Sequence, residues 1–167
     1  MLISTSRKPS QKTRSFCKNL SHALDFTYVN RGKMNMRDLF LKSSQLNYCS
    51  TMIVYEIKGN PSKITFFSND GDEKLAILVS VNITKDRLNI NTNEIKVKSN
   101  CPELSILGEI LGFENSYIVK NNYIDIQKED NNNQNFDSKM GKIATIDFYN
   151  KYGDKTNLQI FVKKILK

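Results

Sequence analysis

Short strand-like runs and amphipathic helical segments alternate through the first part of the chain. Strand-like runs lie at residues 2–5 and 26–29, and each is followed by a segment with helical periodicity. A β-rich run at 51–57 comes next, and turns containing Gly59 and Gly71 separate it from two more strand-like runs. The first half therefore reads β-α-β-α-β-β-β.

The two helical segments carry recognisable start signals. Ser10 is the expected N-cap of the first helix, which runs to about Leu24, and Asn35 followed by Asp38 predicts a capping box for the second. The apolar stripes predict that both helices pack on a core. The expected buried residues are Thr13, Phe16, Cys17, Leu20, Ala23 and Leu24 in the first helix and Met36, Leu39, Phe40 and Leu46 in the second.

The second half has weaker patterns. We expect polar strands around residues 88–97, followed by a helix that Pro102 opens and Gly112 ends. Further strands are expected at 117–119 and 123–126, and a closing hairpin from 142–149 and 158–165. No close internal repeat is visible in the sequence.

Positive charge is concentrated in the first quarter of the chain. The 25 Lys and Arg against 17 Asp and Glu give a net charge of +8. Residues 1–42 contain nine bases and two acids, a net of +7, whereas the remaining 125 residues contain 16 bases and 15 acids, a net of +1. A charge needed only for solubility would be spread more evenly, so this asymmetry favours a polyanionic partner.

The basic residues occupy a helix and the junctions around it. Arg14, Lys18 and His22 follow one another at i, i+4 spacing without an acid, an arrangement that costs about 0.2–0.5 kcal/mol per pair unless an anion lies across it. If the first two strands pair in parallel, both strand–helix junctions emerge at the same end of the sheet. Both helix N-termini would then present free N–H groups to one ligand, as a phosphate backbone requires.

Catalytic and cofactor chemistry lacks a supporting pattern. His22 is the only histidine and has no carboxylate partner nearby in the sequence, and neither Gly-rich nucleotide-binding motif is present. The three cysteines are far apart, so no metal site is expected. We expect no cofactor, no catalytic residue and no small-molecule substrate. Asp70, Asp72 and Glu73 fit a hairpin turn better than a Mg²⁺ site.

Membrane insertion and secretion are also not indicated. The longest apolar run, residues 75–79, is far shorter than the roughly 18 residues that a membrane helix needs. The first residues have their charges after the apolar positions, which is not the pattern of a secretory signal. We therefore expect a cytoplasmic protein that has no membrane partner.

Three segments carry a family resemblance. They read MLISTSRKPSQKTRSF at residues 1–16, TYVNRGK at 27–33 and KGNP at 58–61. Together they resemble the Brix-domain ribosome-biogenesis family in its short archaeal form. The resemblance implies an α/β fold of two similar halves, each like the anticodon-binding domain of class II aminoacyl-tRNA synthetases. It implies a single domain over 1–167, with halves of about 1–85 and 86–167.

The resemblance also implies a role without catalysis, in pre-ribosomal RNA processing and subunit assembly, with ribosomal RNA or a pre-ribosomal particle as partner and other assembly factors alongside. The residues expected to bind RNA are Arg7, Lys8, Lys12, Arg14, Lys18, Asn30, Arg31, Lys33 and Arg37. We expect Arg7, Arg14 and Arg31 to matter most, because a guanidinium can donate two hydrogen bonds to one phosphate. A tRNA-binding module, a metal-dependent nuclease and a protein-interaction scaffold are the alternatives.

Overall fold

The first half of the chain has the element order that the sequence predicts. The computed structural model describes residues 1–129 and 141–166. The elements of the first half are β1 (Leu2–Thr5), α1 (Gln11–Leu24), β2 (Thr27–Tyr28), α2 (Met36–Gln45), β3 (Ser50–Ile57), β4 (Asn60–Ser68) and β5 (Glu73–Asn82). The chain forms two compact units, and it passes from the first to the second within β5, at Val79.

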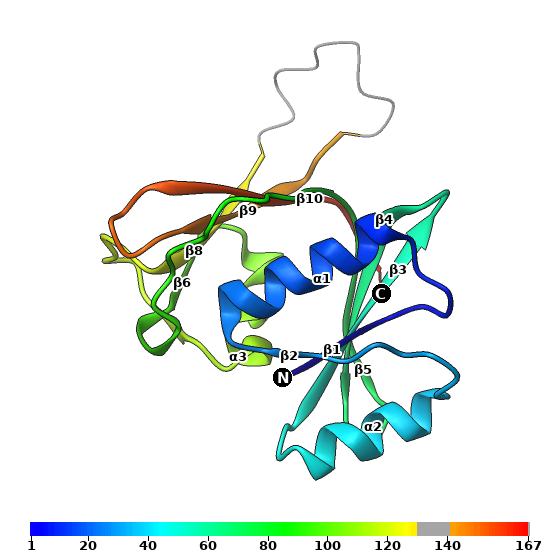
Figure 1. Cartoon of the computed structure of the whole chain (residues 1–167). Coiled ribbons are helices and arrows are strands. Elements are labelled where there is room, and N and C mark those ends of the chain that lie inside the picture. Colours follow the sequence, from blue (N-terminus) through cyan, green and yellow to red (C-terminus); the bar gives the residue numbers. More distant parts are fainter. Residues whose placement is uncertain (130–140, 167) are drawn as a thin grey trace. The chain divides into compact units, whose positions relative to one another are not determined.

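The sheet of the first unit has the spatial order β2-β1-β3-β4-β5. β1 pairs in parallel with β2 and with β3, whereas β3, β4 and β5 pair antiparallel. The parallel pairs require crossover connections, and α1 and α2 supply them. Figure 1 shows the two helices on opposite sides of these strands.

Helix α1 matches its prediction in detail. The Ser10 side chain accepts a hydrogen bond from the Thr13 backbone N–H at 3.2 Å, which makes Ser10 the N-cap. The six residues expected on the apolar stripe are the six that are buried. The helix ends at Asp25, which adopts a left-handed conformation.

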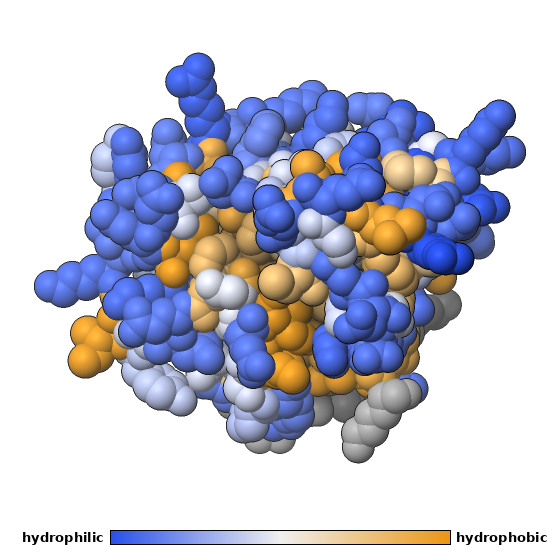
Figure 2. Space-filling model, turned by 90° about the horizontal axis from the view of Figure 1, so that it is seen from below, coloured by the Kyte–Doolittle hydropathy of each residue, from blue (hydrophilic) through white to orange (hydrophobic). Residues whose placement is uncertain are grey.

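Helix α2 has the predicted capping box, because Asn35 and Asp38 each accept a hydrogen bond from the other's backbone N–H. Leu39 packs with Leu2 and Ile53 in a buried cluster below the sheet. The expectation that Leu46 is buried was wrong, since this residue is the C-cap and is 42% exposed. Figure 2 shows other places where hydrophobic residues (orange) reach an otherwise hydrophilic surface.

The second unit repeats the strand order of the first. Its elements are η1 (Thr92–Glu94), β6 (Lys96–Ser99), η2 (Pro102–Leu104), α3 (Ile106–Leu111), β7 (Glu114–Asn115), β8 (Tyr123–Lys128), β9 (Ala144–Tyr149) and β10 (Lys155–Leu166). Their spatial order is β7-β6-β8-β9-β10. β6 pairs in parallel with β7 and β8, and the remaining pairs are antiparallel. The two halves are therefore alike in topology, as the family resemblance implies.

Several expectations for the second half needed correction. The helix opened by Pro102 is split into η2 and α3, although Gly112 ends it as predicted. No strand forms at residues 117–119, and the short strand β7 lies instead at Glu114–Asn115. The polar strand expected from residue 88 begins only at Lys96. In the described part of the chain, no helix is long and apolar enough to cross a membrane.

Candidate nucleic-acid interface

Three connections of the first unit meet at the carboxyl ends of β1, β2 and β3. Ser10, before α1, donates a hydrogen bond from its hydroxyl to the carbonyl of Gly59 in the β3–β4 turn at 2.8 Å. The Ser4 hydroxyl donates to the carbonyl of Val29, after β2, also at 2.8 Å. Because β1 pairs in parallel with both neighbours, the prediction that the two strand–helix junctions emerge together is confirmed.

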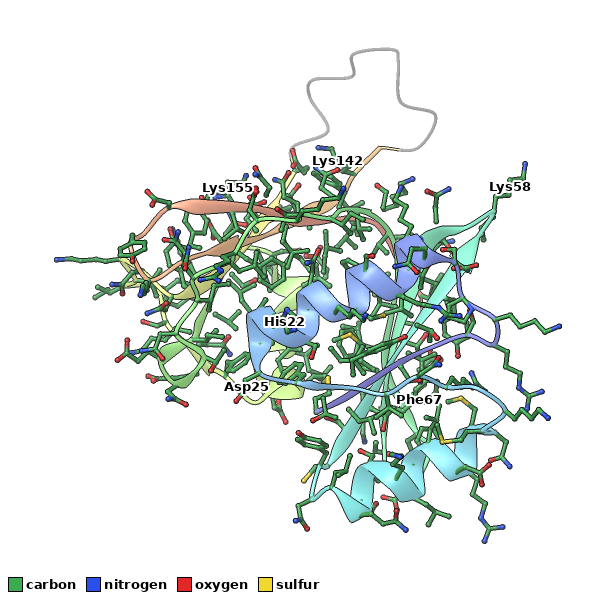
Figure 3. The ribbon with its side chains drawn as sticks, in the orientation of Figure 1. His22, Asp25, Lys58, Phe67, Lys142 and Lys155 are labelled. Atoms are coloured by element: carbon green, nitrogen blue, oxygen red, sulfur yellow. The ribbon has the colours of Figure 1, made fainter. Side chains whose placement is uncertain are left out.

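Exposed cations project from all three connections, and we call this group the basic loop surface. In Figure 3 nitrogen-tipped side chains extend outward from the loops before α1 and α2, and Lys58 points away from the tip of the β3–β4 hairpin. The group comprises Arg7, Lys8, Lys12, Lys33, Arg37 and Lys58, all of them exposed. Asn30, also among the predicted contacts, is exposed between β2 and α2.

Arg31 has a different position from the other predicted contacts. Its side chain is buried, and the residue is 8% exposed. The guanidinium donates from Nε to the carbonyl of Met34 at 3.1 Å and from Nη1 to the carbonyl of Thr5 at 3.4 Å. Arg31 thus joins the end of β1 to the β2–α2 connection from inside. This burial leaves Arg31 little exposed surface for the phosphate contact that the sequence predicts.

Arg14 and Lys18 lie along α1, beyond the loops. Arg14 is partly exposed and its Nε donates to the carbonyl of Pro9 at 3.3 Å, whereas Lys18 and His22 are exposed. With a rise of about 1.5 Å per residue, the column extends roughly 12 Å from Arg14 to His22. His22 is labelled near the end of α1 in Figure 3. The column continues the basic loop surface along the helix.

At each helix N-terminus, a carboxylate of the chain itself accepts a hydrogen bond from the backbone N–H of the N-cap residue. The Glu56 carboxylate on β3 accepts hydrogen bonds from the Ser10 N–H at 2.9 Å and from the Thr13 hydroxyl at 2.5 Å. At the start of α2, the Asp38 carboxylate accepts a hydrogen bond from the backbone N–H of Asn35. Each N-terminus therefore already holds a carboxylate of the chain itself, which competes with a phosphate for that position.

The charge of Glu56 should contribute to the stability of the fold through its hydrogen bonds at the start of α1. Burial raises the pKa of its carboxyl, but hydrogen bonds from Thr13 and Ser10 outweigh burial and leave the pKa below its ordinary value of 4.5. The charged carboxylate therefore stabilises the fold above that value and loses this effect as the pH falls through the lowered pKa. Glu56→Gln should lower the free energy of unfolding at pH 7 by about 1 kcal/mol.

Urea unfolding of wild type and Glu56→Gln at pH 7 and at pH 3 measures this effect. The difference between the two proteins should shrink at pH 3, because protonation of wild-type Glu56 increases as the pH falls toward its lowered pKa. An equal difference at both pH values would mean that the charge of Glu56 contributes nothing.

The cations of residues 1–42 have no ion-pair partner among the described residues. The ion pairs found there, with N to O distances of 4.0 Å or less, all lie in the second unit. They join Lys96 to Glu114, Lys128 to Glu103, Lys142 to Glu129, and Lys155 to Asp147. Within the described residues, no ion pair therefore neutralises the cations of the basic loop surface or of the α1 column.

Comparison with known proteins identifies the family. No family model matches the chain. A protein of Methanothermobacter thermautotrophicus described as a probable Brix domain-containing ribosomal biogenesis protein is 36% identical over 114 residues, which make up 68% of this chain and 71% of that protein. The chain belongs to the Brix-domain ribosome-biogenesis family. An Archaeoglobus fulgidus protein of the same description is 32% identical over 96 residues, covering 58% of this Brix-domain chain and 54% of the relative.

Solved structures agree with the family. The crystal structure of Mil, described as an archaeal Imp4-like protein, matches this Brix-domain chain with a TM-score of 0.83 and 26% identity, and covers 99% of this chain and 98% of Mil. A probable ribosomal biogenesis protein from Aeropyrum pernix has a TM-score of 0.70 at 18% identity, covering 98% of this chain and 94% of that protein. The second match shows the shared fold alone.

Lys58 is a member of the basic loop surface that the site prediction missed. It precedes Gly59 in the β3–β4 turn and has a positive φ of 50°. The turn lies against the start of α1, since Lys12 Nζ also donates to the side-chain oxygen of Asn60 at 2.7 Å. The signal was present, because this turn is one of the three segments that resemble the Brix family, but nothing in the sequence spacing placed it beside α1.

The acids considered for a nuclease lie in an ordinary hairpin turn of this Brix-domain protein. The Asp72 carbonyl accepts a hydrogen bond from the Ser68 N–H at 2.9 Å, and the Gly71 N–H donates to the Ser68 carbonyl at 3.1 Å. Glu73 is the first residue of β5 and pairs with Phe67. Within the described residues, His, Cys, Asp and Glu side chains form no group of three that could hold a metal ion.

Proposed function

We propose that this protein binds ribosomal RNA during ribosome assembly, holding the RNA backbone with the basic loop surface and the α1 column. The observation that carries the proposal is the set of cations without acidic partners at one end of the first unit. Surface cations that are already paired with acids add little to phosphate binding. An unpaired cation that contacts a phosphate releases counterions from the RNA, and this release favours binding. Membership in the Brix-domain family supports the choice of RNA from a pre-ribosomal particle.

The proposed mode of binding is positioning by side chains, without catalysis. Arg7 and the lysines lie on connections that Arg31 and Glu56 hold in place from inside, so the cations are presented by an ordered scaffold. Arg7 can donate two hydrogen bonds to one phosphate, and the exposed amide of Asn30 suits a phosphate or ribose contact. Such contacts follow the shape of the RNA and its 2′-hydroxyl groups more than its sequence.

A salt series tests this proposal. Binding of wild-type protein to ribosomal RNA fragments should weaken with salt. The slope of log K against log salt should be roughly four to five if each of the six side chains of the basic loop surface contacts one phosphate. Matched single-stranded DNA should bind more weakly at equal salt.

Equal affinity for RNA and DNA, or binding that does not change with salt, would contradict the proposal. If transfer RNA binds more strongly than ribosomal RNA in competition, the protein is a tRNA-binding module instead.

A further inference from the structure

One connection of the second unit lacks the helix that its counterpart in the first unit contains. In the first unit, the connection from β2 to β3 contains α2, which covers the face with Leu2 and Ile53. The equivalent connection, from β7 to β8, contains no helix. Val97 and Ile124 pair with each other and are buried on one face of this sheet. The residues directly before and after Val97 and Ile124 point to the opposite face of the sheet.

A row of tyrosines and lysines crosses this other face. Lys96 pairs with Tyr123, Tyr123 with Tyr149, and Tyr149 with Lys155. The rings of Tyr123 and Tyr149 stack in parallel, with centroids 4.3 Å apart and planes 7° apart. Both tyrosines are partly exposed, and Lys155 is labelled near the start of β10 in Figure 3. Because the two rings are already held in a stack, a further flat group can stack on them with little additional loss of side-chain entropy.

The adjoining β9–β10 turn adds a third tyrosine. Tyr152 is 68% exposed, and Lys151 Nζ lies 5.0 Å from the centroid of its ring. The Asn150 side chain accepts hydrogen bonds from the backbone N–H groups of Tyr152 and Asp154, both at 2.9 Å, which fixes the turn.

The β7–β8 connection is fastened to this turn. The Asn121 side chain donates to the carbonyl of Lys151 at 3.1 Å, and the Asn122 N–H donates to the carbonyl of Asn150 at 2.9 Å. Gly153 lies so close that an added Cβ would be 2.8 Å from the carbonyl oxygen of Lys120. The backbone of Lys120 is therefore held beside the β9–β10 turn.

The charges around the tyrosines leave two lysines available. Lys96 is paired with Glu114 at 3.5 Å and Lys155 with Asp147 at 2.7 Å. Lys120 and Lys151 are exposed, and neither forms an ion pair with a carboxylate in the part of the chain that the structure describes. The surface thus combines aromatic faces with two cations that form no ion pair within the described residues, and single-stranded nucleic-acid sites share these two components.

We propose that Tyr123, Tyr149 and Tyr152, with Lys120 and Lys151, form a tyrosine platform that binds unpaired RNA nucleotides by base stacking. The tyrosines offer π-faces to the bases, and the two lysines contact the neighbouring phosphates. This inference rests on the proposed RNA-binding function and adds a second contact, specific for single strands. A duplex keeps its bases stacked on each other, so it cannot use the platform.

The test compares single-stranded and duplex RNA. Tyr152→Leu and Tyr149→Leu should each lower the affinity for an oligouridine of about ten nucleotides by roughly 5-fold to 100-fold and leave the affinity for duplex RNA unchanged. The chain contains no tryptophan, so the tyrosine fluorescence of wild-type protein should be quenched by the single strand. Tyr117→Leu is the matched control, because Tyr117 is 82% exposed and outside the platform.

Three other results would contradict the tyrosine platform. Unchanged oligouridine binding in both platform variants would overturn the platform, while salt-dependent binding would still support the basic loop surface. Equal losses for single strands and duplexes would overturn stacking. If wild-type protein binds neither RNA, the platform and the proposed function are both wrong.

Discussion

Replacing Arg7, Lys8 and Lys33 together with glutamate should lower the affinity for ribosomal RNA on the order of 100-fold at low salt. Each of these side chains is exposed and lacks a carboxylate partner among the described residues. Each lost phosphate contact should reduce the slope of log K against log salt by about 0.7 to 0.9, so the triple variant should lose about two to three. Fluorescence anisotropy with a labelled RNA fragment, repeated over a salt series, measures both quantities.

The control for this variant must change the net charge equally. Lys85→Glu, Arg87→Glu and Lys164→Glu combined replace three exposed cations of the second unit. Because general attraction between protein and RNA depends on net charge, this control should weaken binding slightly and keep most of the slope. If both triple variants lose the same affinity and slope, RNA responds to total charge and the basic loop surface has no special role.

Phe16→Ala should produce the largest loss of stability, about 3–5 kcal/mol in the free energy of unfolding. Phe16 is fully buried in α1, and removal of its ring leaves a cavity that the surroundings fill only in part. Domains of this kind have total stabilities of about 5–15 kcal/mol, so the variant should be close to unfolding. Urea unfolding followed by circular dichroism measures the change.

Phe40→Ala is the matched comparison for this prediction. Phe40 lies on α2, is partly exposed and has its ring 5.6 Å from that of Phe67. Since less of the ring is buried, its removal should cost no more than about 2 kcal/mol. A loss below about 1 kcal/mol for Phe16→Ala would mean that α1 is not firmly packed on the sheet, and the basic column on its outer side would then lack a fixed support.

The first half of the fold could be predicted because its signals are local. The buried set of α1, its Ser10 cap and the Asn35–Asp38 capping box follow from spacings of three and four residues, and the structure contains each of them. The second half was harder. β7 has two residues and α3 has six, and elements this short carry too few apolar positions to show a period. The residue patterns of the second half therefore do not reveal the strand order that it shares with the first half, although the family resemblance implies two similar halves.

The candidate site divides in the same way. The sequence by itself determined where the positive charge is concentrated, which residues cap the helices and which side of α1 is buried, because these properties depend on residue type and on near neighbours along the chain. Only the tertiary structure decided that Arg31 is buried between two connections, that Glu56 occupies the start of α1, and that Lys58 lies beside it. Glu56 is 46 residues from Ser10, and Arg31 is 26 residues from Thr5. Contacts over such separations arise from strand pairing, which no local pattern specifies.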